Sequence, residues 1–535
     1  MSRIFSLVTA ILLFSGFALA QQINEITQIG DNRAEVDQEG DNISRIQQAN
    51  TGGDENVAKV NQESEAGDEN TSFIRQQGTG NNLEVRQEGD NSSSINQISY
   101  ENRAEIRQEG YNISEIFFQG GVDNRLKVTQ EGFNEFEGSQ LGEGNNGEVN
   151  QEGFDNYAGV AQGAVQDGDE NRAEVRQEGD ENYVLILQGI EFVSDENRAK
   201  VTQEGIGNSV GIPSVGRTGI LQSGEENNAE VRQEGAFNFV PNLVQIGEEN
   251  RAEVRQEGEE NILMTIEQTG NENRVEVHQK GNENNFTSIT QEGDDNRAEV
   301  RQVGDRSVNT SGPIQQLGEG NRAEVRQNGE ENKFTTIFQT GDENQAKIIQ
   351  EGDRNNILHI DPRFGGIVQL GAENQGEYRQ EGEENFMQNF EQDGDKNHAM
   401  FVQEGVFNQA SLNQRGDENH AEANQDGEIN EFFINQEGEE NHAEIRQEDA
   451  LNFAGIGQVG FENHGEIHQD GDGNVAFARQ DGSDNYIKIV QDGDGNLSDL
   501  TQVGVGNSYT NIQKGDGHVN VVSQTGGGNV TLVQD

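Results

Sequence analysis

The chain has 535 residues, of which 30% are hydrophobic and 6% aromatic, with 68 glycines, four prolines and no cysteine or tryptophan. Its formal net charge of -62 argues against nucleic acid and anionic membrane surfaces as partners, and the missing cysteines exclude disulfides and thiolate metal sites. So few apolar residues are typical of a disordered chain, unless they recur at fixed intervals and are buried together by stacking.

The first segment, residues 1–20, has the three parts of a secretory signal peptide. Arg3 supplies a positive start, the run IFSLVTAILLFSGF is apolar, and Ala18, Leu19 and Ala20 form a small-residue cleavage site. A membrane anchor is the alternative, but the apolar run is too short to span a bilayer comfortably. We therefore predict a secreted protein whose mature chain begins at Gln21.

From Asn32 onward the chain consists of units of about 22 residues, so we predict one repeat domain over residues 21–535. Each unit has two halves that share Asn-x5-Gln followed by x-Gly-x-x. Late in the chain, successive units begin at Asn397, Asn419, Asn441, Asn463, Asn485, Asn507 and Asn529. Roughly twenty-one full units fit.

Within each half, residue character alternates with period two, which predicts a strand and not a helix. In a first half, the face expected to point inward consists of Asn171, Ala173, Val175 and Gln177. In a second half, it consists of Asn485, Ile487, Ile489 and Gln491. The other face is expected to point outward at Arg172, Glu174 and Arg176 and at Tyr486, Lys488 and Val490.

Between the strands, segments such as QEGDEN (177–182) predict tight turns with positive φ. Two strands and two turns make one rung, which should not fold alone. Ordering about 22 residues costs roughly 30 kcal/mol, whereas each large apolar side chain returns only about 1.5 to 3 kcal/mol. Rungs stacked in parallel register would pair their backbones, and their Asn and Gln side chains would form ladders. The predicted fold is an all-β parallel β-solenoid of about twenty-one rungs.

The predicted structural ladder contains the same positions in several units. They are Asn171, Ala173, Val175, Gln177, Gly179, Asn419, Ala421, Gln425, Gly427, Asn430, Gln436, Gly438, Asn441, Ala443 and Gln447. The second halves are expected to be the variable side of each rung, because they hold insertions, extra residues that indicate bulges, and all four prolines. The prolines are Pro213, Pro241, Pro313 and Pro362.

The repeat resembles that of the curlin family, whose members are subunits of extracellular curli amyloid fibres with the motif Ser-x5-Gln-x-Gly-x-x-Asn-x-Ala-x3-Gln. Positions that fit this spacing are Asn408, Gln414, Gly416, Asn419, Ala421, Gln425, Asn430, Gln436, Gly438, Asn441, Ala443 and Gln447. Asn replaces the leading Ser in most units, and the repeats begin almost directly after Ala20. The resemblance implies a β-solenoid that forms fibres in a biofilm matrix, together with a secretion pore and a curlin-like nucleator as partners.

We therefore expect a structural fibre subunit that polymerises end to end. The expectation rests on two segments, QQINEITQIG and GGGNVTLVQD, which are repeat-like and not polar caps. The alternative is a monomeric extracellular adhesin or a cation-binding rod, with recognition carried by the insertions near Pro213 and Pro362.

Neither a catalytic site nor a cofactor is expected, because no catalytic constellation stands outside the repeat. The acidic turns do not match calcium-binding loops, so diffuse screening by cations is favoured. Four histidines recur every 22 residues at one outward position, and His468 follows the last of them. They are His398, His420, His442 and His464. The favoured interpretation is that His replaces Arg at a tolerant exposed position, so no metal site is predicted; the alternative is a column that binds Zn²⁺, Cu²⁺ or Ni²⁺.

Overall fold

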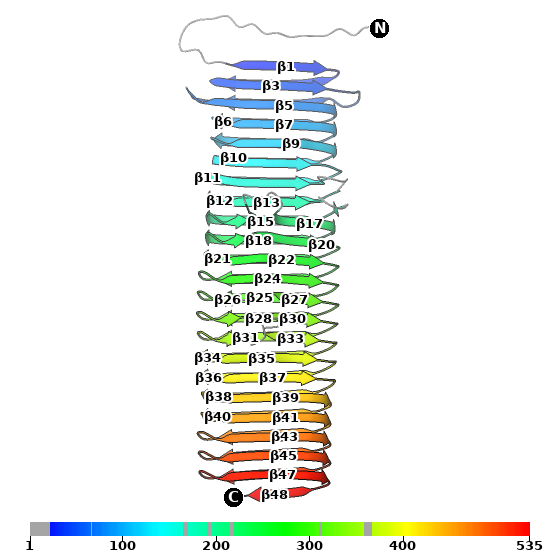
Figure 1. The fold of residues 1–535 in the computed structure, drawn as a ribbon. Coiled ribbons are helices and arrows are strands. Elements are labelled where there is room, and N and C mark those ends of the chain that lie inside the picture. Colours follow the sequence, from blue (N-terminus) through cyan, green and yellow to red (C-terminus); the bar gives the residue numbers. More distant parts are fainter. Residues whose placement is uncertain are drawn as a thin grey trace, which may run out of the picture. The chain divides into compact units, whose positions relative to one another are not determined.

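The computed structural model describes residues 22–65, 67–163, 169–189, 194–212, 218–309, 313–357 and 366–534 (Figure 1). The predicted signal peptide and the two insertion prolines, Pro213 and Pro362, lie outside the described residues. The chain divides into two compact units. The first contains Met1–Glu260 and Met264–Gln268, and the second contains Asn261–Leu263 and Thr269–Asp535.

Both units are parallel β-solenoids, as predicted, and contain no helix in the described ranges. Together the described residues make about 22 turns. In each unit the first-half strands pair with first-half strands of the neighbouring turns, and second-half strands with second-half strands. Since the described residues hold no helix, none is long and apolar enough to cross a membrane.

The first-half strands form one stack in each unit. In the first unit they are β2 (Asn32–Glu39), β4 (Asn56–Glu63), β6 (Asn82–Gly89), β8 (Arg103–Gly110), β12 (Arg172–Asp180), β15 (Arg198–Ile206), β18 (Asn228–Ala236) and β21 (Arg251–Glu259). In the second unit they are β23 (Arg274–Lys280), β25 (Arg297–Val303), β28 (Arg322–Asn328), β31 (Gln345–Glu351), β34 (Gln375–Glu383), β36 (His398–Val406), β38 (His420–Glu428), β40 (His442–Ala450), β42 (His464–Asp470), β44 (Tyr486–Asp492), β46 (Ser508–Lys514) and β48 (Val530–Gln534).

The second-half strands form the facing stack. In the first unit they are β1 (Ile23–Ile29), β3 (Asp41–Ala49), β5 (Glu69–Thr79), β7 (Ser92–Tyr100), β9 (Ile113–Val122), β13 (Tyr183–Gln188), β14 (Ser194–Asp195), β16 (Ser209–Val210), β17 (Gly219–Glu225), β19 (Phe239–Val240) and β20 (Asn242–Ile246). Two longer strands, β10 (Arg125–Gln140) and β11 (Asn146–Gln162), run through both halves, and β22 (Ile262–Thr269) has residues in both units. In the second unit the second-half strands are β24 (Asn285–Glu292), β26 (Val308–Asn309), β27 (Ile314–Leu317), β29 (Lys333–Phe334), β30 (Ile337–Thr340), β32 (Asn356–Ile357), β33 (Ile367–Leu370), β35 (Phe386–Asp393), β37 (Gln409–Arg415), β39 (Glu431–Glu439), β41 (Phe453–Phe461), β43 (Val475–Ser483), β45 (Leu497–Val505) and β47 (Val519–Gly527).

The core of each unit lies between its two stacks and contains the predicted inward faces. Ala173 and Val175 are 1% exposed, and Ile487 and Ile489 are fully buried. The outward residue Arg172 is exposed. The period-two pattern therefore gave the correct inward face, but β44 was wrongly expected to be a second half: it pairs with β42 in the first-half stack, because both halves share the same Asn-x5-Gln pattern.

The second halves carry the irregularities, as expected. Pairing shifts register between Ile95 and Gln97 in β7 and between Met387 and Asn389 in β35. Both described prolines also lie in second halves, where their carbonyl oxygens still accept: Pro241 from Gly219 N at 2.8 Å and Pro313 from Ile337 N at 3.3 Å. An extra residue or a missing N–H on this side is absorbed without disturbing the first-half register.

Candidate functional site: the amide ladders

Buried asparagines form ladders that link each turn to the next. Asn197 donates both its backbone N–H and its Nδ2 to Asn171 Oδ1, at 3.1 and 3.2 Å. Asn441 repeats the pattern with Asn419, with an Nδ2 to Oδ1 distance of 3.0 Å. In the second halves, Asn430 donates its backbone N–H to Asn408 Oδ1 at 3.0 Å. An amide that would cost free energy if buried alone is thus satisfied by the same amide one turn away.

Buried glutamines also form ladders, but here the side chain of the earlier turn donates to that of the later turn. Gln177 Nε2 donates to Gln203 Oε1 at 2.9 Å, and Gln425 Nε2 donates to Gln447 Oε1 at 2.8 Å. Gln436 makes the same bond to the next turn, and its Nε2 also donates to the carbonyl oxygen of His420 at 2.9 Å. The glutamines therefore connect successive turns and also tie the second-half stack to the first-half stack.

The recurring turn glycines allow the turns to approach closely. Gly438 has φ 124°, and a Cβ built on it would lie 2.0 Å from the carbonyl oxygen of Gly460. At Gly179 the corresponding distance, to the oxygen of Gly205, is 2.1 Å. Any side chain here would push neighbouring turns apart, so the glycine is required by contact as well as by φ. Gly427 faces Asp449, which takes the glycine place with φ 64°.

The remaining ladder positions are small and apolar. Ala421 and Ala443 are fully buried and pair directly in register between β38 and β40. They lie between the Asn and Gln ladders along each strand, so a turn of the solenoid alternates amide bonding with apolar contact.

Two stretches of the chain match a known family, the Curlin associated repeat. The model of that family matches residues 168–205 and 462–493, which cover β12 with most of β15 in the first unit and β42 to β44 in the second. Among curated proteins, no relative matches the chain.

The turns contain a further ladder that we did not predict from the sequence. A turn aspartate accepts the backbone N–H of the equivalent residue one turn earlier: Asp472 N donates to Asp494 Oδ1 at 2.9 Å, and Asp494 N donates to Asp516 Oδ1 at 3.0 Å. In the first unit, Asp195 Oδ1 accepts from Asp169 N at 3.0 Å. The signal was the recurrence of Asp two residues before Asn, which we interpreted as a mark of tight turns and of acidic charge that cations screen.

The four histidines of the second unit form a stacked column on the outward face. The ring centroids of His398 and His420 are 4.8 Å apart, those of His420 and His442 are 4.8 Å apart, and those of His442 and His464 are 4.5 Å apart. Their planes are within 12° of parallel. Because the rings are stacked in parallel, their nitrogen lone pairs lie in separate parallel planes and do not converge on one ion. Within the described ranges, no group of three or more His, Asp or Glu side chains is arranged to hold a metal ion.

Two inner histidines of the column have a lowered pKa, which favours their neutral form. Burial, together with the neighbouring His442 and His398, lowers the pKa of His420 to about 4. Burial and His464 also lower the pKa of His442. Glu466 lies at the end of the column. Its partial burial raises its pKa, but hydrogen bonds from Lys488 and His464 outweigh this effect and lower the pKa to about 2.

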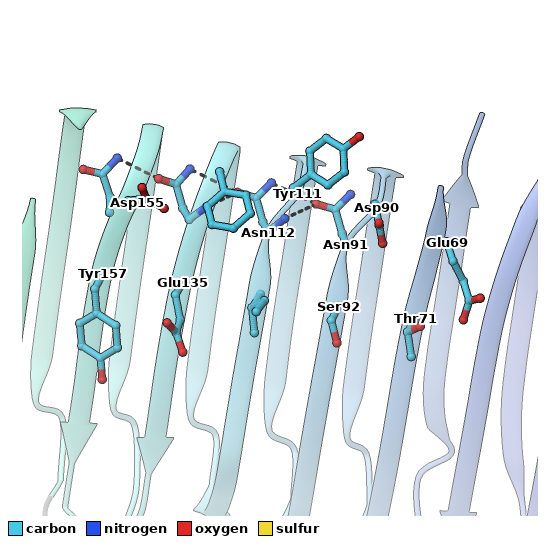
Figure 2. Close-up of a pocket in the computed structure, with 14 residues that line it drawn as sticks. Glu69, Thr71, Asp90, Asn91, Ser92, Tyr111, Asn112, Glu135, Asp155 and Tyr157 are labelled. Carbon is cyan, nitrogen blue, oxygen red and sulfur yellow. Dashed lines mark hydrogen bonds between the residues drawn. The ribbon is translucent and has the colours of Figure 1, made fainter. Parts of the chain in front are cut away.

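A groove of about 410 Å³ lies on the outside of the first unit, along the corner that precedes the second-half strands (Figure 2). Tyr111 and Phe133 lie on adjacent turns of this corner, and Tyr157 stands at its far end. The floor consists of the Asn ladder, in which Asn112 Nδ2 donates to Asn91 Oδ1 at 3.0 Å. The sequence analysis did not predict this groove.

Proposed function

We propose that the chain is a structural subunit of a secreted, curli-like amyloid fibre that contributes to a biofilm matrix and to surface adhesion. The observation that carries the proposal is the in-register ladder, as between Asn419 and Asn441. Because most turns offer the same donors and acceptors as their neighbours, an outermost turn can bind a second copy of the chain as an inner turn binds the next one. The curlin repeat family is structural, which supports a structural and not a catalytic role.

The proposed joint uses atoms of the outermost described turns. Asn529 Nδ2 donates to Asn507 Oδ1 at 2.7 Å, and its own Oδ1 is the acceptor that the next turn of a ladder uses. In a neighbouring copy, Asn32 would supply the donor. Gln38 Oε1 supports the same proposal, since it is buried and has no hydrogen-bond partner among the described residues. Docking a copy on each side would continue both strand stacks, with the first-half Asn ladder unbroken and with His518 and Gln22 meeting in the second-half ladder.

Secretion and partners follow from the resemblance and from residues 1–20. We propose that the signal peptide is removed, that the mature chain crosses an outer-membrane pore, and that a curlin-like nucleator starts assembly. The chain itself is the principal partner, and no cofactor, nucleic acid or membrane span of the mature chain enters the proposal.

The joint can be tested at Val530, the first residue of β48. At the equivalent position one turn earlier, Ser508 N donates to Asn529 O at 2.6 Å, so the N–H of Val530 is directed at the next turn. Val530→Pro removes this donor and should slow seeded fibre growth by about tenfold or more. Val530→Ala keeps the N–H and should grow like the parent chain. Equal growth of both variants would contradict the proposed joint.

A monomeric extracellular adhesin or cation-binding solenoid is the second candidate. The groove beside Tyr111 favours it, because ligand recognition there requires no assembly. Sedimentation after long incubation separates the two candidates: a persistent monomer supports the adhesin, and loss of monomer into fibres supports the structural subunit.

A further inference from the structure

The corner groove of the first unit combines aromatic faces with carboxylates. Tyr111 and Phe133 are 51% and 50% exposed. Tyr111 leans along the groove, and its hydroxyl donates to Asp68 Oδ1 at 3.4 Å. Ile113 adds a further exposed apolar side chain at 42%. The rim therefore offers π faces and apolar surface over neighbouring turns.

The side-chain amides on the floor of the groove already form hydrogen bonds with one another. Asn134 Nδ2 donates to Asn112 Oδ1 at 3.2 Å, and Asn156 Nδ2 donates to Asn134 Oδ1 at 2.8 Å. Tyr157 is engaged as well, since its hydroxyl donates to Glu137 Oε2 at 2.9 Å. A ligand would break ladder bonds if it competed for the floor amides. Recognition must therefore come from the rings and carboxylates of the rim.

The rim carries negative charge that no cation neutralises. Its carboxylates are Glu69, Asp90, Glu135 and Asp155, and the residues that line the groove include no Lys, Arg or His. None of the four carboxylates forms an ion pair with another side chain in the described part of the chain. Burial raises the pKa of Glu135, and the carboxylates of Glu137 and Glu115 raise it further, as expected where like charges gather without a counter-ion.

We propose that this groove binds an extended organic cation, of the class of linear polyamines, with its ammonium groups at the rim carboxylates and its methylene chain along Tyr111, Ile113 and Phe133. Ammonium groups are attracted to carboxylates and to aromatic faces, and the methylene segments remove the exposed rings from water. A metal ion would use the carboxylates alone and would leave the apolar rim exposed. The site belongs to a single chain, so it does not depend on fibre formation.

The test is calorimetric titration of the unassembled full chain with spermidine at physiological salt. The parent chain should show saturable binding. Tyr111→Leu combined with Phe133→Leu keeps every charge and removes both rings, and it should weaken binding by about tenfold. Tyr111→Phe keeps the ring and should bind almost as the parent does, which also guards against a folding defect in the double variant.

Charge-matched variants separate this site from diffuse attraction to an acidic chain. Glu135→Gln with Asp155→Asn removes two charges from the groove and should also weaken binding by about tenfold. Glu272→Gln with Glu283→Gln removes two exposed charges from turns of the second unit and should change it by less than about twofold. Unsaturable binding, or equal losses in the groove and control variants, would overturn the proposal.

Discussion

Asp494 Oδ1 accepts the backbone N–H of Asp472 at 2.9 Å, so a turn that reads as surface charge also bonds to the turn before it. Asp494→Ala should lower the free energy of unfolding by about 1 kcal/mol, because the N–H of Asp472 loses its acceptor. Asp494→Asn keeps an acceptor oxygen and should cost much less, although it removes a charge. Thermal unfolding of the unassembled chain measures both. A larger loss in the Asn variant would mean that charge, and not the hydrogen bond, is what matters here.

Some turn glycines are required because a neighbouring turn lies too close for a side chain, and others only because their φ is positive. A Cβ on Gly438 would lie 2.0 Å from the oxygen of Gly460, whereas a Cβ on Gly473 would have no atom within 4 Å. Gly473→Ala should therefore cost only the positive φ, about 1 kcal/mol, while Gly438→Ala must also separate two turns and should cost about 3 kcal/mol or more. Unfolding by denaturant compares the two. Similar losses would show that the turns yield readily.

Three adjacent turns of the second unit place Phe407, Ile429 and Leu451 at a corner with φ 59°, where later turns have glycine. Ile429 is β-branched and 50% exposed, so it bears backbone strain with little burial in return. Ile429→Gly should raise stability by up to about 1 kcal/mol. The control Ile434→Gly removes a buried side chain and should be strongly destabilising. If Ile429→Gly lowers stability instead, the contacts of the exposed side chain stabilise the protein by more than the backbone strain costs.

The histidine column predicts a pH dependence with a defined sign. The folded pKa of His420, about 4, lies below the ordinary value of 6.5, so protonation favours the unfolded chain. Stability should fall as pH drops below 6.5, with the loss complete near pH 4. Glu466, with a pKa of about 2, adds a loss only below its ordinary value of 4.5.

Between pH 6.5 and 4.5 the histidines lower stability as pH falls, whereas a carboxyl group with a raised pKa, such as Glu135, raises it, so the contribution of the histidines is measured as the difference between variant and parent. His420→Gln with His442→Gln should make stability fall less in this window than it does in the parent chain. An unaltered slope in the double variant would contradict the assignment to the column.

Much of the fold could be predicted because the repeat shows its faces directly. Asn171 and Gln177 recur at spacings that only a strand can place on one side, and the cost of a lone rung demands stacking. Asp494 was misjudged because a carboxylate in a turn can be solvent-facing charge or a backbone acceptor, and only the approach of the next turn decides. The groove beside Tyr111 was missed for a similar reason: rings on separate turns become neighbours only when the register is known.

The central claim is that the ladders continue from one chain to the next. We would test it by electron microscopy and fibre diffraction of purified residues 21–535 incubated in moderate salt. We expect unbranched fibres with a meridional spacing of about 4.8 Å, since the joint should repeat the spacing within the chain. Separate particles that never join would contradict it and would favour the monomeric adhesin.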